Sequence, residues 1–154
     1  MMRTLEPWVE PPLTAFLRES SAQLVLLMTA SGQVIAQHGF IRSVDVMSCA
    51  ALGAAIVAST GELARLLGIA SLRHVVHQGG ARRVLLAPFT MPKGSWIGLI
   101  VFGADTSIGL VQVFFTRLAA DLHGAAPAPI PAPGLLAEQF EDELNASLRS
   151  LFGR

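Results

Sequence analysis

The chain has 154 residues, the size of one domain with a short appendage, and it is unusually apolar. Hydrophobic residues make up 52% and charged residues only 14%, against about 25% charged in a typical domain. The eleven basic and eleven acidic residues cancel, so the excess of positive charge that nucleic-acid binding needs is absent. A monomer of this size cannot bury so much apolar material, and we therefore expect an oligomer or an obligate partner.

The sequence also bears on the compartment. No run approaches the roughly 18 uninterrupted apolar residues of a transmembrane helix, so no membrane span is expected. The first ten residues include Glu6, Pro7 and Glu10 and lack the apolar region of a signal peptide. A single cysteine, Cys49, excludes an internal disulfide and a Cys-rich zinc site. These features predict a cytoplasmic protein.

In chain order, the pattern predicts a helix, a hairpin, a long helix, three more strands and a further helix. The first and last strands are continuous apolar runs, which is typical of strands covered on both faces. The two-residue turns Ser31-Gly32 and Gly79-Gly80 join neighbouring strands as hairpins. The predicted segments are a helix from Pro11, strands Ala22–Ala30 and Gln33–Gln37, a helix over Ser43–Gly68, strands Ser71–Gln78, Ala81–Phe89 and Trp96–Gly103, and a helix over Ile108–Leu122.

The element order α-β-β-α-β-β-β-α predicts an α+β fold, an α/β sandwich with helices on both faces of a five-stranded sheet. The sheet should be mostly antiparallel, because hairpins rather than crossovers join most strands. Ser71–Gln78 is polar on both faces, as an edge strand would be. Residues 1–123 form this domain, 124–134 a stiff Pro/Ala linker, and 135–154 a C-terminal amphipathic helix.

The C-terminal helix carries an apolar stripe at steps of four and three residues. Acidic residues crowd its first half and Arg149 lies near its end, which suits the helix dipole. On a tether, such a helix either folds back onto the domain or docks elsewhere, and the sequence leaves both options open. The stripe consists of Leu136, Phe140, Leu144, Leu148 and Leu151.

The helix over Ser43–Gly68 has two contrasting faces. Its large apolar residues, expected to hold the sheet, are Cys49, Leu52, Ile56, Leu63, Leu66 and Leu67. Its small residues are Ala50, Ala51, Ala54, Ala55, Ala58 and Gly61, with no charge between Asp45 and Glu62. A helix face that carries only small residues predicts that another helix or another protein packs closely against it. The alternative is that alanine only reflects helix propensity, but Gly53 and Gly61 each cost roughly 1 kcal/mol mid-helix, which favours an interface.

Signatures of catalysis and cofactor binding are absent. The chain has no P-loop, no G-x-G-x-x-G after a strand, and no C-x-x-C, H-E-x-x-H or G-x-S-x-G. His74 and His77, three apart on a strand, point to opposite faces and cannot share a metal. Trp8 and Trp96 could anchor a ligand, although Trp96 fits better as the start of a buried strand. We therefore predict no catalytic residue, no cofactor, no metal site and no enzymatic activity of the chain's own.

This combination of segments resembles the Roadblock/dynein light chain family. The resemblance rests on the element order, the apolar first strand with its Ser-Gly turn and the long small-residue helix. Within it, V-A-S-T-G-E-L-A-R-L-L-G over Val57–Gly68, followed by V-H-Q-G over Val76–Gly79, is similar to the MglB-type bacterial members. The likeness covers about residues 11–123, and an acidic amphipathic tail after a linker is also similar.

The resemblance implies a homodimer whose sheets join edge to edge through the strand Ser71–Gln78, with the two long helices side by side. It places Leu72, His74, Val76, Gln78 and Ala50 at the dimer interface. It also implies that the helix pair binds a small Ras-like GTPase of the MglA type through a ridge formed by Ala54, Ala58, Gly61, Glu62 and Arg65. Glu62 departs from the family pattern, because a second small residue often stands there.

Two functions are expected from these features. The first is a homodimeric regulator that binds a small Ras-like GTPase and stimulates GTP hydrolysis without donating a catalytic residue. The alternative is a non-catalytic dimeric scaffold that assembles a complex, with the C-terminal helix as its adaptor. A small-molecule enzyme or sensor is a third and weaker option.

Overall fold

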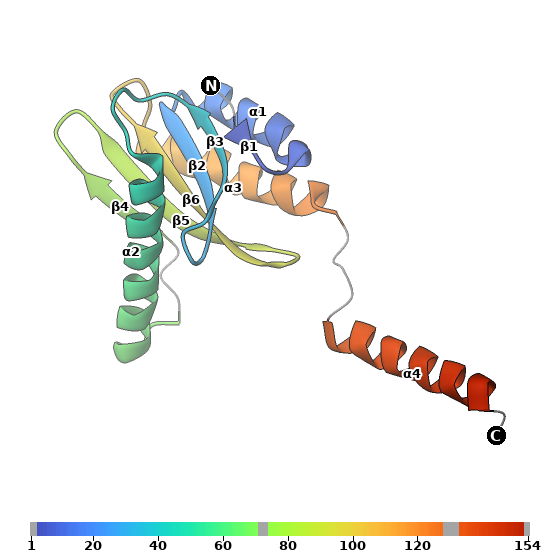
Figure 1. The fold of residues 1–154 in the computed structure, drawn as a ribbon. Helices are drawn as coiled ribbons and strands as arrows, with labels where there is room; N and C mark the ends of the chain where they lie inside the picture. Colours follow the sequence, from blue (N-terminus) through green and yellow to red (C-terminus); the bar gives the residue numbers. More distant parts are fainter. Residues whose placement is uncertain (1–2, 71–73, 128–132, 153–154) are drawn as a thin grey trace.

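The molecule is built on one antiparallel sheet with helices on both faces (Figure 1). The computed structural model describes residues 3–70, 74–127 and 133–152. The strands are β1 (Arg3–Thr4), β2 (Leu24–Thr29), β3 (Val34–Gly39), β4 (Val75–Gln78), β5 (Arg83–Met91) and β6 (Gly94–Phe102). The helices are the short 3-10 helix η1 (Pro7–Val9), α1 (Glu10–Ser20), α2 (Val46–Leu66), α3 (Ile108–Ala125) and α4 (Pro133–Phe152).

The strand order is β1-β3-β2-β6-β5-β4, and every neighbouring pair is antiparallel. The predicted α+β class, the five strands and their order among the helices are confirmed. The sequence pattern missed β1, whose two residues pair with Gln37 and Ala36 of β3. Strand β4 lies at the opposite edge, as its polar sequence predicted.

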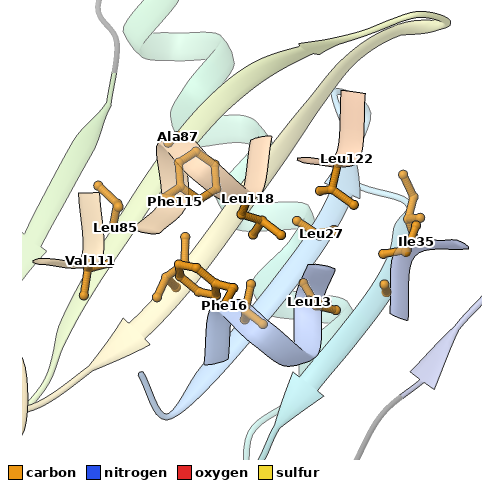
Figure 2. Close-up of a cluster of buried hydrophobic side chains, with 14 of the residues drawn as sticks. Leu13, Phe16, Leu27, Ile35, Leu85, Ala87, Val111, Phe115, Leu118 and Leu122 are labelled. Carbon is orange, nitrogen blue, oxygen red and sulfur yellow. The ribbon is translucent and has the colours of Figure 1, made fainter. Parts of the chain in front are cut away.

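The two faces of the sheet carry separate apolar clusters. In β2, Val25 and Leu27 belong to the cluster with α1 and α3, whereas Leu26 and Met28 belong to the cluster with α2. Successive residues of a strand point to opposite faces, so a continuous apolar run is what two covered faces require. Figure 2 shows the larger cluster, where side chains of α1 and α3 converge on the sheet.

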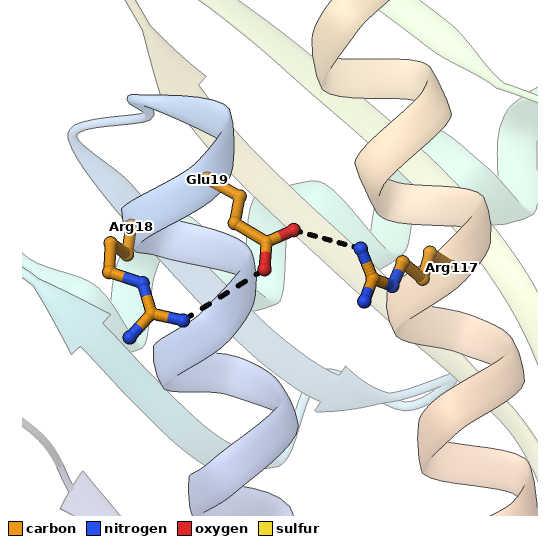
Figure 3. Close-up of polar contacts among 3 residues, drawn as sticks. All are labelled: Arg18, Glu19 and Arg117. Atoms are coloured by element: carbon orange, nitrogen blue, oxygen red, sulfur yellow. Dashed lines mark hydrogen bonds and ion pairs between the residues drawn. The ribbon is translucent and has the colours of Figure 1, made fainter.

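Helices α1 and α3 are also tied by charge at their surface. Glu19 of α1 accepts a hydrogen bond of 3.0 Å from Nη1 of Arg117 on α3, and Arg18 lies 3.9 Å from the same carboxylate (Figure 3). Glu19 is 29% exposed and both arginines are more so, which limits the contribution to the order of 1 kcal/mol or less. Apolar packing therefore holds these helices together.

Gly98 lets α3 lie close to the sheet. A Cβ at this position of β6 would overlap the Phe115 ring, and Phe115 is itself wedged edge-on against Phe16 and Phe89. Phe115 is also only 7% exposed, so the ring is held within the cluster. The missing side chain of Gly98 is thus a packing requirement of the α3 face.

We predict that Gly98→Ala lowers the free energy of unfolding by about 1–3 kcal/mol, because overpacking a filled core costs this much. Urea denaturation would measure it. Gly80→Ala is the matched control, since no atom lies within 4 Å of the added Cβ there. Equal stability of the two variants would contradict the packing role of Gly98.

Candidate partner-binding surface

Small residues hold α2 against the sheet. Its buried positions are Ala50, Gly53, Ala54 and Ala64. A Cβ on Gly53 would lie 3.2 Å from Leu86 Cδ2 and 3.3 Å from Leu99 Cδ1, which is tighter than ordinary contact. The helix can approach the sheet this closely only because these side chains are small.

The expectation that the large apolar side of α2 holds the sheet is wrong for its leucines, whereas Cys49 and Ile56 are partly buried against the cluster on the sheet. Leu52 is 65% exposed, Leu63 52% and Leu66 69%. We call these three residues the leucine stripe. Periodicity correctly placed them together, but the sheet takes the opposite side of the helix.

This inversion changes the placement of two predicted interface residues. Ala50 is completely buried and Ala54 nearly so, both in the cluster between α2 and the sheet. Neither can touch a partner while the helix stays docked. Their assignment to the dimer interface and to the partner-binding ridge is corrected on this ground.

The other four residues of the predicted ridge are exposed together on the C-terminal half of α2. We call Ala58, Gly61, Glu62 and Arg65 the α2 ridge. Arg65 donates hydrogen bonds to Oε1 of Glu62 through Nε, at 2.9 Å, and through Nη2. The carboxylate that departs from the family pattern is thus paired with a neighbouring cation, in an exposed pair that a competing charge can replace. No Cβ contact within 4 Å would arise at Gly61, so packing inside this chain does not require a glycine there.

The edge strand β4 presents the remaining predicted interface residues. His74, just before the strand, and Val76 and Gln78 within it are exposed, and Leu72 lies outside the described residues. The Gln112 amide nitrogen of α3 lies 2.8 Å from Nε2 of His74, within hydrogen-bonding distance. Among the described strands, β4 pairs with β5 alone, so no described strand covers its other edge.

A cavity of about 370 Å³ connects the α2 ridge to the β4 edge. It lies beneath the C-terminal half of α2, which extends past the sheet in Figure 1. Its walls include Gly61 and Arg65 of the ridge together with His74 and Val75. Sequence patterns missed this hollow, because it forms where a helix overhangs strands distant in the chain.

Helix α2 also has the composition of a membrane span. Among the described helices, it alone is long and apolar enough to cross a bilayer, and only 17% of its most apolar stretch is buried. The expectation of no membrane span is thus not supported by composition alone. Against insertion, Ala50, Gly53 and Ala54 already pack on the sheet, and a bilayer would have to replace those contacts. No group of three or more metal-ligating side chains gathers in the described part of the chain.

Solved structures with the same arrangement of elements are known. MglB of Myxococcus xanthus superposes with a TM-score of 0.70 at 23% identity, covering 78% of this chain and 95% of that one. The gliding protein MglB of Thermus thermophilus gives 0.68 at 26% identity over 77% and 88%. A Roadblock/LC7 domain from Streptomyces avermitilis gives 0.64 at 14% identity over 79% and 97%.

The fold is that of the Roadblock proteins, in its MglB-type form. No protein-family model and no curated protein matches the sequence, so three-dimensional likeness carries the assignment, together with 26% identity to the Thermus protein. The long helix α2 on one face of the sheet and the edge strand β4 beside it are both parts of this fold.

Asp45 fixes where α2 begins. Its carboxylate accepts hydrogen bonds from the Ser48 hydroxyl at 2.7 Å and the Ser48 N–H at 3.1 Å. The Ser48 hydroxyl and then its N–H lower the pKa of Asp45 below the ordinary aspartate value. This N-cap satisfies an otherwise unpaired donor in the first turn.

We predict that Asp45→Ala lowers the melting temperature at pH 7, whereas Asp45→Asn, which still accepts the N–H, preserves most of it. A lowered folded-state pKa stabilises the protein above the ordinary carboxyl pKa of about 4, and that gain is lost as pH falls through the lowered value. Asp45→Asn should therefore lose less stability than the native chain below about pH 4. Thermal unfolding at several pH values would measure both effects, and identical acid profiles would contradict the cap.

Proposed function

We propose that this protein is a homodimeric, non-enzymatic regulator that binds a small Ras-like GTPase and stimulates its GTP hydrolysis. The observation that carries the proposal is the exposed surface of α2, where the leucine stripe and the α2 ridge lie beside an unpaired edge strand. The MglB-type fold supports it as well. Such a partner belongs in the cytoplasm.

The orientation of α2 supports dimerisation through β4. Ala51 lies against Gly32 in the β2–β3 turn, and Gly53 faces Leu86 of β5. At 100° per residue, Ile56 and Leu63 lie round the helix on the Gly53 side, towards β5 and β4. Two copies joined at β4 would bring these apolar sides together across the joint, while covering the exposed edge strands.

Two residues of the α2 ridge are left free in that dimer. Ala58 and Glu62 lie on the Ala51 side of the helix, away from the joint. Small side chains there would let a partner's backbone come close. Glu62 and Arg65 form an ion pair with each other. On binding a charged partner, they would break this pair and form ion pairs with the partner's side chains. As the family resemblance implies, stimulation would come from rearranging the GTPase's own loops.

We predict that Ala58→Arg abolishes GTPase binding and stimulation while the dimer stays folded, because a long charged side chain blocks the ridge. Ala120→Arg is the matched control, an exposed alanine of α3 on the other face of the sheet. Pull-down with nucleotide-loaded GTPase and phosphate release would measure both. Normal binding by the Ala58 variant would refute the ridge assignment.

We predict that Val76→Lys shifts the protein from dimer to monomer, since a lysine on an edge strand opposes pairing with a second sheet. Light scattering after size exclusion would give the mass. Leu5→Lys, an equally drastic change at the opposite edge of the sheet, should leave the dimer intact. An unchanged mass for Val76→Lys would locate the dimer contact elsewhere.

The exposed stripe of α4 favours a second candidate, the dimeric scaffold. Phe140 is 68% exposed and Leu151 78%, with Leu144 and Leu148 between them also exposed. We predict that deleting residues 127–154 separates the two functions. A GTPase regulator should keep most of its stimulation on the core, whereas a scaffold should lose its partner. Hydrolysis assays and co-purification on the same deletion would decide.

A further inference from the structure

A large apolar hollow lies beside the start of α2, at the β1 edge of the sheet. It measures about 560 Å³, and its walls come from β1, β3, the first residues of α2 and the chain that joins β3 to α2. We call it the edge hollow. Three of its lining residues are largely exposed, Leu5 at 70%, Phe40 at 72% and Met47 at 70%. The described core therefore leaves apolar surface uncovered here.

One helix is too few to cover this face of the sheet. Neighbouring strands lie about 4.8 Å apart, so six strands extend over roughly 24 Å. Packed helices are spaced by roughly 8–10 Å, so a face of this width takes two of them. The other face carries both α1 and α3, whereas α2 lies mainly over β2, β6 and β5 (Figure 1). The edge hollow lies where a second helix beside α2 would pack.

The walls of the edge hollow are suited to apolar side chains rather than to a polar metabolite. Small-molecule sites need a few polar groups that are free to orient the ligand. Among the described lining residues Asp45 alone is charged, and both of its carboxylate oxygens accept hydrogen bonds from Ser48. The Thr4 hydroxyl donates to the Glu6 carbonyl at 2.8 Å. Little polar capacity is left for a ligand.

Helix α4 offers a matching set of apolar side chains. We call its four exposed residues Phe140, Leu144, Leu148 and Leu151 the α4 stripe. At 100° per residue they fall within about 80° of one another, while Asp142 and Arg149 lie on the other side and would stay in water. The stripe is about 16 Å long at 1.5 Å per residue, close to the roughly 17 Å of β3. In Figure 1, α4 stands clear of the sheet.

The two tryptophans mark the place where the chain leaves the core. Trp8 of η1 and Trp96 of β6 stack with ring centroids 5.7 Å apart and planes at 22°. Ala126 and Pro127, directly after α3, line a hollow of about 60 Å³ together with these indoles and Glu6. The tether to α4 therefore begins beside Glu6.

From this point α4 can reach the edge hollow of its own chain. Glu6 directly follows Leu5, which lines the edge hollow and donates its N–H to the Ile35 carbonyl of β3. The five residues 128–132 can span up to roughly 17 Å. The 20 residues of α4 add about 30 Å. The length of the tether is thus sufficient to bring the α4 stripe to β3.

We propose that the edge hollow binds the chain's own α4 through the α4 stripe, so that α4 lies beside α2 as the second helix of that layer. The structure shows the undocked arrangement (Figure 1). Docking would cover the α4 stripe together with Phe40 and Met47. Met47 precedes Ala58 by about three helical turns, on the same side of α2, so a docked α4 would lie next to the α2 ridge. The proposal does not rest on the GTPase function.

The test follows how fast a thiol in the edge hollow reacts. In a Cys49→Ser background, Met47→Cys leaves one cysteine in the full-length chain, at the hollow. A bulky maleimide can reach this thiol only while α4 is undocked. The rate of alkylation therefore measures how often the hollow is open.

Three forms of α4 are compared in this background. We expect several-fold faster alkylation with Leu144→Asp/Leu148→Asp than with native α4, because carboxylates in the stripe oppose docking in an apolar hollow. The matched control Asn145→Asp/Ala146→Asp adds the same charge outside the stripe, at residues that are also exposed, and should react at the native rate. Equal rates for all three forms would overturn the proposal. Circular dichroism would verify that each variant is folded.

A second reporter separates the edge hollow from the leucine stripe of α2. Leu66→Cys in the same Cys49→Ser background should react at a rate that does not depend on α4. If native α4 protects Leu66→Cys and leaves Met47→Cys unprotected, the helix covers the leucine stripe, and the edge hollow is not its site.

A synthetic peptide of residues 133–152 tests docking in trans. Added at about millimolar concentration to the Leu144→Asp/Leu148→Asp protein, it should restore protection of Met47→Cys, since a short tether provides a comparable effective concentration. A peptide without effect would contradict the proposal. Protection by native α4 should persist on dilution, and its loss would assign the docked helix to a second copy and overturn docking within one chain.

Discussion

The close contact between α2 and the sheet decides what the rest of the molecule displays. Gly53 sits where even a methyl group would press on Leu86 and Leu99, and the neighbouring sheet-facing residues are alanines. A larger side chain at Gly53 would push the helix away from the central strands. Small residues thus take the closest contact positions, Ile56 and Val57 pack at its margin, and the leucine stripe is turned outward.

That outward surface has an energetic consequence. Burying a leucine side chain contributes about 1.5–3 kcal/mol. Because the three leucines of the stripe are exposed, a monomer lacks several kcal/mol of stabilisation that their burial would give. Association costs an estimated 4–15 kcal/mol or more, because the two molecules lose translational and rotational freedom. In the proposed dimer, two copies of the stripe would be of the size needed to offset that cost, with backbone pairing at β4 as a further contribution. Within the described residues of one protomer, the leucine stripe is exposed and β4 pairs with β5 alone.

The sequence predicted the architecture because each central strand is apolar throughout and each hairpin has its turn residues. Periodicity could also group Leu52 with Leu63 on one face of α2. It could not say which face meets the sheet, since that depends on the volumes of Leu86 and Leu99 across the contact. Ala50 and Ala54 were misplaced for this reason. The two-residue β1 is too short to show a period, and the tryptophan stack joins residues far apart in the chain.

The sheet separates two kinds of surface. On one face, α2 exposes apolar and small residues beside a strand edge, which suits a partner that brings its own folded surface. On the other face, the stacked indoles of Trp8 and Trp96 border a hollow of only about 60 Å³. Two buried clusters that share no residue in the described chain underlie these surfaces, so occupation of one need not distort the other. Because α2 and the α1/α3 layer pack on opposite faces, a partner on the α2 surface would leave the other face of the sheet unchanged.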